Sequence, residues 1–108
     1  MLMSDEWVLL IESNRLFKEE NYNNQKSIAC ILAYYNGSKY IKDQLKSIIN
    51  QQIKNASLSI FISDDNSNIE FPSIKDLNFH NENNIRIFYR KLDKNIGYSN
   101  NFLYSLKS

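Results

Sequence analysis

Short apolar runs separated by polar breaks recur along the chain from residue 26 onward. Three of them, residues 28–33, 58–62 and 85–89, have the length of strands and few polar positions. The first run is apolar throughout, which is typical of a strand buried on both faces of a parallel sheet. The three runs therefore predict three strands of one sheet.

The segments that follow these runs favour helices. After the Asn36-Gly37-Ser38 break, apolar residues recur at three- and four-residue steps, and Asn36 or Ser38 is placed to cap the helix that they predict. Residues 73–79 suggest a short second helix, and apolar residues at 102–106 begin a last one. Strands that alternate with helices predict right-handed crossovers and hence an α/β fold with a three-layer, mostly parallel, Rossmann-like sheet. The apolar positions of the first helix are Ile41, Leu45, Ile48, Ile49 and Ile53.

The N-terminal residues show a different pattern. Within residues 5–20 the apolar side chains are spaced as in a helix, with acidic residues early and a lysine late, which is the order that a helix dipole favours. We therefore predict an accessory helix and linker over residues 1–25, followed by a domain over residues 26–108. The apolar positions of this helix are Trp7, Leu10, Ile11, Leu16 and Phe17.

Composition and charge exclude several classes of function. The net charge is +1 and no basic stripe is present, which argues against a protein that tracks nucleic-acid phosphates. Cys30 is the only cysteine, so no intramolecular disulfide forms, and its apolar neighbours predict a packing role. No apolar stretch has the length of a membrane span, and the acidic start does not resemble a signal peptide. His80 is the sole histidine, and no catalytic triad, glycine-rich phosphate loop or metal-ligand cluster can be assembled, so we expect no metal and no cofactor in this chain.

Two polar clusters follow the first and second predicted strands. Residues 34–37 read Tyr-Tyr-Asn-Gly, and residues 64–67 read Asp-Asp-Asn-Ser. Because ligands of open α/β sheets bind beyond the carboxyl ends of the strands, we expect the two clusters to lie side by side at a binding site. A carboxylate only accepts hydrogen bonds, so it suits the imide N–H of uracil or thymine, or ribose hydroxyls, and a tyrosine ring offers a surface for the base. The spacing supports equally the alternative that Asp64 and Asn66 merely cap the turn that follows.

Several segments in a fixed order cover residues 27–108, about three quarters of the chain. They are Ser27-Ile28-Ala29-Cys30-Ile31-Leu32-Ala33-Tyr34-Tyr35-Asn36-Gly37, Tyr40-Ile41, Leu45-Lys46-Ser47-Ile48-Ile49-Asn50-Gln51-Gln52, Ile60-Phe61-Ile62-Ser63-Asp64-Asp65-Asn66-Ser67, Asn95-Ile96-Gly97 and Asn101-Phe102. Any single piece is weak, but the series resembles the opening of family-2 glycosyltransferases, and its ending is similar to the branch with rhamnosyltransferase-like enzymes. The resemblance implies the N-terminal, nucleotide-binding half of a GT-A fold.

The resemblance also implies a nucleotide site at the ends of the predicted strands. Asp65 would contact the base, and Asp64 would orient its loop or approach the ribose. Asn101 would brace the wall beneath the nucleotide. Family members often have Thr or Ser where this chain has Ala33, so backbone contacts would replace a side-chain contact there. The implied nucleotide-binding residues are Ala33, Tyr34, Tyr35, Asn36, Asp64, Asp65, Asn95 and Gly97.

The activity implied by the resemblance is transfer of a sugar from a UDP or dTDP donor to a glycan or lipid-linked acceptor, in the synthesis of a bacterial cell-surface polysaccharide. The complete enzymes hold a divalent metal, Mn or Mg, at an Asp-x-Asp element and use a later carboxylate as general base. This chain has no Asp-x-Asp triplet and ends before either element, so we expect it to be inactive alone. The implied location is the cytoplasm or the inner face of the membrane.

Two other interpretations stay open on the sequence. One is a stand-alone, non-catalytic nucleotide-binding or interaction module, and the other is a plain α/β domain with a capped acidic turn. The resembled fold also orders the strands three, two, one, which leaves residues 28–33 at an edge with no charge or proline to protect it. We expect this edge to pair with a second copy in a homodimer, unless the helix predicted within residues 5–20 covers it.

Overall fold

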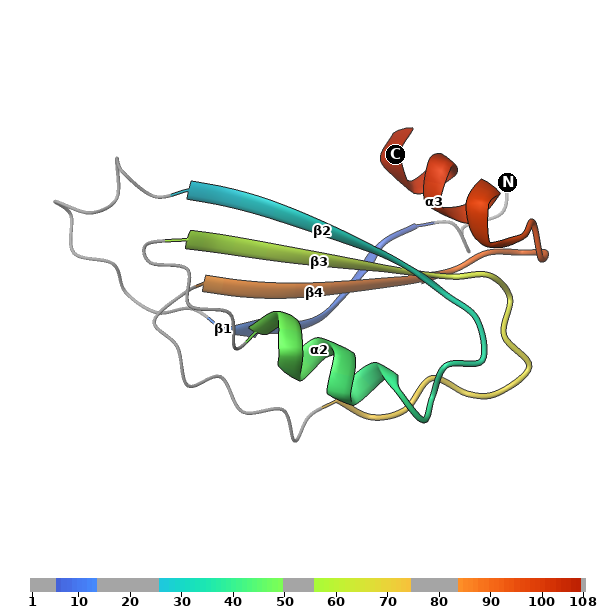
Figure 1. Ribbon diagram of the computed structural model, residues 1–108, viewed down its shortest axis with the longest axis horizontal. Coiled ribbons are helices and arrows are strands. Elements are labelled where there is room, and N and C mark those ends of the chain that lie inside the picture. Colours follow the sequence, from blue (N-terminus) through green and yellow to red (C-terminus); the bar gives the residue numbers. More distant parts are fainter. Residues whose placement is uncertain (1–5, 14–25, 50–55, 75–83, 108) are drawn as a thin grey trace, which may run out of the picture.

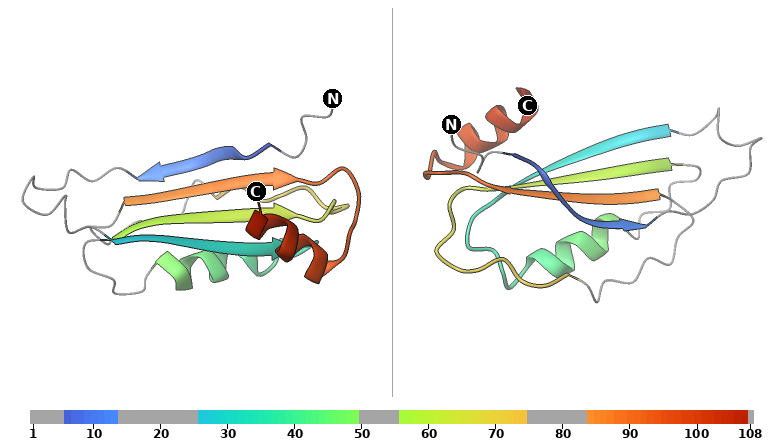
Figure 2. Two further views of the ribbon diagram at one scale, coloured as in Figure 1. Left: turned by 90° about the horizontal axis from the view of Figure 1, so that it is seen from above. Right: turned by 180° about the vertical axis from the view of Figure 1, so that it is seen from behind.

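The computed structural model describes residues 6–13, 26–49, 56–74 and 84–107, over which the chain forms one sheet and two helices. The strand order is β1-β4-β3-β2, in which β2, β3 and β4 are parallel and β1 is antiparallel to β4. Helices α2 and α3 lie on opposite faces of this sheet (Figure 1 and Figure 2), so the predicted three-layer, mostly parallel α/β fold is confirmed. The elements are β1 (Val8–Ser13), β2 (Lys26–Tyr34), α2 (Ile41–Ile49), β3 (Ala56–Asp64), β4 (Asn84–Lys91) and α3 (Tyr98–Lys107).

The main core lies between the sheet and α2. Side chains alternate along a strand, so every second residue of β3 and β4 faces the helix. The apolar stripe of α2 meets them, and burying each such side chain contributes about 1.5–3 kcal/mol. Cys30 packs at the border of this core, and its burial raises the pKa of the thiol, as suits a packing role. The buried residues that meet here include Ile41, Leu45, Ile49, Leu58, Ile60, Ile62, Ile85 and Ile87.

The prediction of a helix within residues 5–20 is wrong over Val8–Ser13, which form the antiparallel strand β1. The pairing with β4 explains the difference, because it gives these residues backbone hydrogen bonds on both sides of a register shift between Leu9 and Ile11, and it lets Ile11 pack against the core. Helical periodicity is a weak preference that such tertiary contacts override. Residues 14–25 lie outside the described part of the chain.

The sequence also predicted a short helix over residues 73–79 and a last helix at the C-terminal end, and only the last one is confirmed. The helix predicted at the C-terminal end is confirmed as α3, which lies on the sheet face opposite α2, at the carboxyl ends of the parallel strands (Figure 1). Its buried residues are the polar Asn101 and Ser105, whereas its apolar residues Phe102, Leu103 and Leu106 are exposed. Ser73 and Ile74 are not helical, and the rest of the short helix predicted over residues 73–79 lies outside the described residues.

As predicted, β2 is an edge of the described sheet, and β1 does not cover it because β1 pairs with β4 at the opposite edge. We therefore expect the chain to associate through an antiparallel pairing of β2 with its own copy about a two-fold axis. Light scattering at micromolar concentration should find a dimer for the wild type and a monomer for Ile31→Lys. The control Leu9→Lys places the same charge on β1 and should remain dimeric. A monomeric wild type, or a dimer that survives Ile31→Lys, would contradict this pairing.

Candidate functional site

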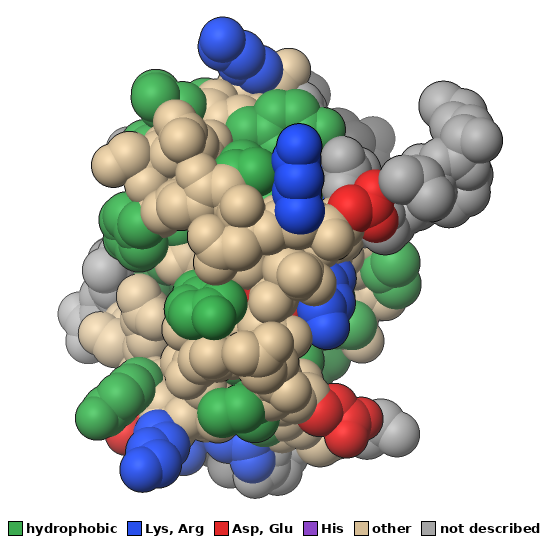
Figure 3. Space-filling view, turned by 90° about the vertical axis from the view of Figure 1, so that its right-hand side faces the viewer, with side chains coloured by type: hydrophobic (Ala, Val, Ile, Leu, Met, Phe, Trp, Pro, Cys, Tyr) green, Lys and Arg blue, Asp and Glu red, His purple; other side chains and the backbone are tan. Residues whose placement is uncertain are grey.

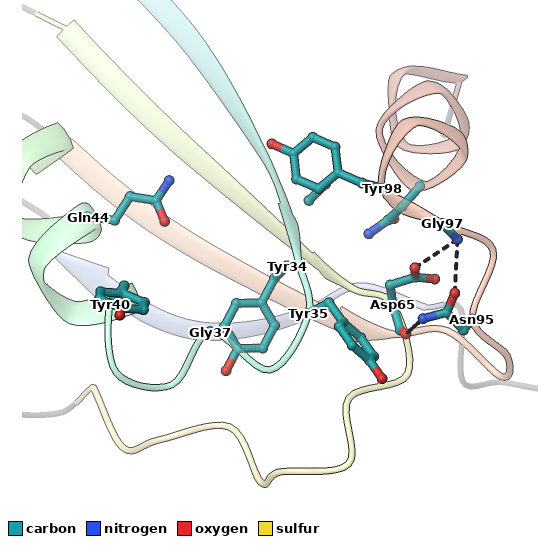
Figure 4. A pocket seen from close by; sticks show the side chains of 11 residues that line it. Tyr34, Tyr35, Gly37, Tyr40, Gln44, Asp65, Asn95, Gly97 and Tyr98 are labelled. Atoms are coloured by element: carbon teal, nitrogen blue, oxygen red, sulfur yellow. Dashed lines mark hydrogen bonds between the residues drawn. The ribbon is translucent and has the colours of Figure 1, made fainter.

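A cleft of about 470 Å³ opens at the carboxyl ends of β2 and β3. Figure 4 shows Tyr40 and Gln44 on the side of α2, and Gly97 and Tyr98 on the side of α3. Seen from outside, this end of the molecule is mostly uncharged, and its few charged side chains are scattered (Figure 3). The predicted site residues that line the cleft are Ala33, Tyr34, Tyr35, Asp65, Asn95 and Gly97.

The tyrosines of the cleft differ in exposure. Tyr34 is 5% exposed and packs edge-on against Phe71, with ring centroids 5.2 Å apart. Burial, together with the nearby Asp64, raises the pKa of its hydroxyl. Tyr35, by contrast, is 49% exposed, and Tyr98 on the opposite side is 73% exposed. Tyr40, on the side of α2, is 72% exposed, so the aromatic surface open to a ligand belongs to Tyr35, Tyr40 and Tyr98, with Tyr34 as part of the core behind them.

Asn36 does not line the cleft but connects two loops. Its backbone N–H donates a 2.7 Å hydrogen bond to the hydroxyl of Ser67, and its side-chain oxygen accepts a 2.9 Å hydrogen bond from the N–H of Asn68. The residue has a left-handed backbone, with φ of 49°, which asparagine tolerates better than most residues. These contacts hold the turn after β2 against the turn after β3. The alternative in which Asn36 caps α2 is not what the geometry shows.

Gly37, the next residue, is constrained by a close approach. A Cβ atom at this position would lie 3.2 Å from Cε2 of Tyr34, which is tighter than ordinary contact. Its carbonyl accepts the 3.0 Å hydrogen bond from the N–H of Ile41 that starts α2. Glycine is therefore favoured here for space, so that α2 can begin directly beside the cleft.

Asp64 also lies outside the cleft. Asp64 is 1% exposed. Its carboxylate accepts hydrogen bonds from the N–H and the hydroxyl of Ser67, and from the hydroxyl of Tyr89. Burial and this bond raise the pKa of the Tyr89 hydroxyl, so the tyrosine remains a donor. These are the contacts of a residue that orients its loop, which is one of the two roles that the sequence left open for Asp64.

Asp65 joins the loop after β3 to the start of α3. One carboxylate oxygen accepts a 2.7 Å hydrogen bond from the N–H of Ile96. The other accepts a 2.9 Å bond from the N–H of Gly97, which Figure 4 shows. Its carbonyl accepts a 3.2 Å bond from the side-chain amide of Asn95. The negative charge thus sits at the N-terminal end of α3, where the helix dipole favours it. Gly97 has φ of +89°, which glycine adopts at no steric cost.

Five residues that line the cleft were not among the predicted nucleotide-binding residues. Asn101, expected only as a brace, is fully buried and donates a 2.7 Å hydrogen bond from its amide nitrogen to the carbonyl of Ser63. Its side-chain oxygen has no hydrogen-bond partner within the described segments. Gln44 lies one helical turn after Tyr40, so the two side chains are on the same face of the helix. If one of them is known to line the cleft, this spacing predicts that the other does too. The additional lining residues are Gly37, Tyr40, Gln44, Tyr98 and Asn101.

The described residues offer no obvious place for a metal ion. No three His, Cys, Asp or Glu side chains come together in this part of the chain. The carboxylates of Asp64 and Asp65 both accept hydrogen bonds from other groups of the protein. In the same residues, neither helix is long and apolar enough to cross a membrane.

Comparison with protein families identifies the domain. The family model described as Glycosyl transferase family 2 matches residues 29–107, a range that contains every residue lining the cleft. The chain belongs to glycosyl transferase family 2. A search of curated proteins and a search of solved structures found no match. The glycosyltransferase-type domain of this family therefore starts within β2 and extends through α3, and the rhamnosyltransferase-like branch stays a prediction.

The contacts of Asp64 generate a stability prediction. Asp64→Ala would leave the Tyr89 hydroxyl and the Ser67 N–H without their buried acceptor, at a cost of about 1–3 kcal/mol for each unsatisfied group. We expect the free energy of unfolding, measured by urea denaturation, to fall by roughly 2–5 kcal/mol. The matched control is Asp43→Ala, which removes an exposed carboxylate from α2 and should change stability by about 0.5 kcal/mol at most. Equal stabilities of the two variants would contradict the role given to Asp64.

Proposed function

We propose that the cleft binds the nucleotide of a UDP or dTDP sugar, so that the domain recognises the donor of a sugar transfer. The observation that carries the proposal is the carboxylate of Asp65, buried at the foot of an uncharged, tyrosine-rimmed cleft at the carboxyl ends of parallel strands. In this proposal the acceptor is a glycan or lipid-linked glycan of a bacterial cell surface. The enzyme then works in the cytoplasm or at the inner face of the membrane.

The chemistry of Asp65 supports a base with an imide N–H. Each carboxylate oxygen already accepts one hydrogen bond, and each keeps a further lone pair. Uracil and thymine present an N–H donor at N3, whereas cytosine presents an acceptor at the same position, which a carboxylate repels. Tyr35 offers an exposed ring of the kind on which bases stack.

The backbone of β2 supports the same proposal. The carbonyl of Tyr34 accepts a 2.8 Å hydrogen bond from the N–H of Asp65, so Tyr34 directs its backbone polar groups toward β3. Because successive residues of a strand alternate in this respect, the N–H and C=O of Ala33 point toward the free edge. A base in the cleft can thus pair with backbone groups, as expected where the alanine offers no polar side chain. Asn101 borders the cleft at the α3 wall, where its side-chain oxygen is buried and has no hydrogen-bond partner among the described residues.

Catalysis needs groups that the described residues do not bring together. The family resemblance implies a divalent metal, Mn or Mg, but Asp64 and Asp65 are engaged and have no third acidic neighbour in the described ranges. These residues therefore do not fit a metal site, and we derive no step through one. The proposal gives this chain donor recognition and assigns neither metal binding nor deprotonation of the acceptor to any described residue.

Calorimetric titration tests the base site. UDP should bind more tightly than ADP or CDP, and Asp65→Ala should weaken UDP binding about 10- to 150-fold, the loss of one charged hydrogen bond worth ~1.5–3 kcal/mol. Because Asp65 also holds the α3 loop, the ratio of UDP to CDP affinity is the decisive quantity. Loss of a base contact lowers this ratio, whereas loosening of the loop weakens both nucleotides equally. Equal affinities of the wild type for UDP, ADP and CDP, unchanged in Asp65→Ala, would remove the base-site assignment. Asp43→Ala is the control for the loss of a negative charge.

The second test concerns turnover. The 108-residue chain should neither transfer nor hydrolyse the sugar of a UDP or dTDP donor, with or without manganese or magnesium. Chromatographic detection of released UDP or dTDP over hours provides the measurement. Release that depends on protein concentration and metal would show that the chain carries catalytic groups of its own.

A further inference from the structure

A buried arginine connects three parts of the molecule on the sheet face that α3 covers. Arg90 of β4 is 2% exposed, and its Nε donates a 3.0 Å hydrogen bond to the hydroxyl of Ser63 on β3. Its Nη2 donates a 2.9 Å hydrogen bond to the hydroxyl of Ser105 on α3. The guanidinium carbon lies 4.2 Å from the ring centroid of Trp7 and 4.6 Å from that of Tyr104. A cation held by two rings and two hydroxyls keeps a defined orientation.

Trp7 reaches this arginine because β1 pairs with β4. It immediately precedes β1, and its ring also meets Phe61 edge-on, with centroids 5.2 Å apart. Phe61 in turn stacks on Phe88, at 4.9 Å and an interplanar angle of 7°. Residues 6–13 precede the segment that matches glycosyl transferase family 2. The contact with Arg90 therefore links a segment outside the family match to the matched domain.

The attachment of α3 to the sheet depends on polar contacts. Its buried residues, Asn101 and Ser105, are polar, whereas its apolar residues are only partly covered. Among the described residues, three hydrogen bonds join it to the sheet, at Gly97 through Asp65, at Asn101 through the carbonyl of Ser63, and at Ser105 through Arg90. Two of the three points, Gly97 and Asn101, line the cleft.

We propose that Arg90 is a positioning residue for the α3 wall of the cleft and that Trp7, outside the family match, holds Arg90 in place. Trp7 covers the guanidinium and excludes water, which strengthens the hydrogen bonds to Ser63 and Ser105. Without the ring, Arg90 becomes hydrated and α3 loses its third attachment. The opposite wall begins at Gly37 and belongs to α2 on the other sheet face, so it does not depend on Arg90.

The two glycines of the chain make this asymmetry measurable. Gly37 lines the cleft on the α2 side and Gly97 on the α3 side, so a protein labelled with ¹⁵N-glycine gives one amide signal from each wall. In Trp7→Leu, which keeps apolar cover but removes the aromatic ring, the Gly97 signal should shift while the Gly37 signal stays. Arg90→Lys, which keeps the charge but loses the planar fork, should act in the same direction. Glu12→Gln is the control, because it weakens the 3.1 Å ion pair with Arg86 on the same strand pair and should move neither signal.

The outcomes decide the proposal. A Gly97 signal that stays in place in Trp7→Leu overturns it, and so do equal shifts of both glycines, which would indicate a general loosening of the fold. If Arg90→Lys does not fold, Trp7→Leu decides alone, since its side chain is only partly buried at the margin of the sheet.

A second measurement rests on the proposed function. UDP affinity should be about three- to tenfold weaker in Trp7→Leu and unchanged in Glu12→Gln. A wild type that does not bind UDP would refute the nucleotide site, while the glycine signals would still report whether Trp7 and Arg90 position α3. A wild-type UDP affinity retained in Trp7→Leu, together with an unshifted Gly97, would refute the positioning role alone.

Discussion

Two acidic residues at the end of β3 have to be buried, and the ways in which their charges are satisfied determine the geometry of this end of the sheet. A carboxylate removed from water is costly unless several donors surround it. Asp64 obtains its donors from its own turn and from β4, and Asp65 obtains them from the backbone before α3. The loops after β3 and β4 are therefore fixed by the same requirement, and the cleft lies where they meet β2.

Asp64 and Asp65 have different contacts, although both lie in the segment that matches the family. The two neighbouring aspartates look equivalent in the sequence, yet only Asp65 borders the cleft. Asp64 supports the turn that presents it. The sequence supported a capping role and a binding role equally. Asp64 has the contacts of the first role, and the proposed binding role concerns Asp65, whose carboxylate has more lone pairs than the loop uses.

The parallel strands, α2 and the position of the cleft were predictable because they depend on periodicity and on a general property of α/β sheets. β1 was not, since the apolar positions within residues 5–20 also fit a helix, and only the unpaired edge of β4 decides between the two. The positions of Asn36, Asp64 and Asp65 required knowledge of partners up to 33 residues away, which local spacing does not contain. The contact between Arg90 and Trp7 had no sequence signal, because it joins residues that are far apart in the sequence.

The long stretch of sequence between β1 and β4 affects the order in which the chain folds. Val8 pairs with Tyr89, so β1 cannot find its partner until the ribosome has released nearly the whole described sequence. Closing so long a loop costs entropy that local contacts do not repay early, and pairings of this kind form late. Until then the apolar residues around Trp7 stay exposed, whereas β2, α2 and β3 are contiguous in the chain and can assemble as they emerge. The cleft would then take its final shape only after β1 has paired with β4, which lies far along the chain from it.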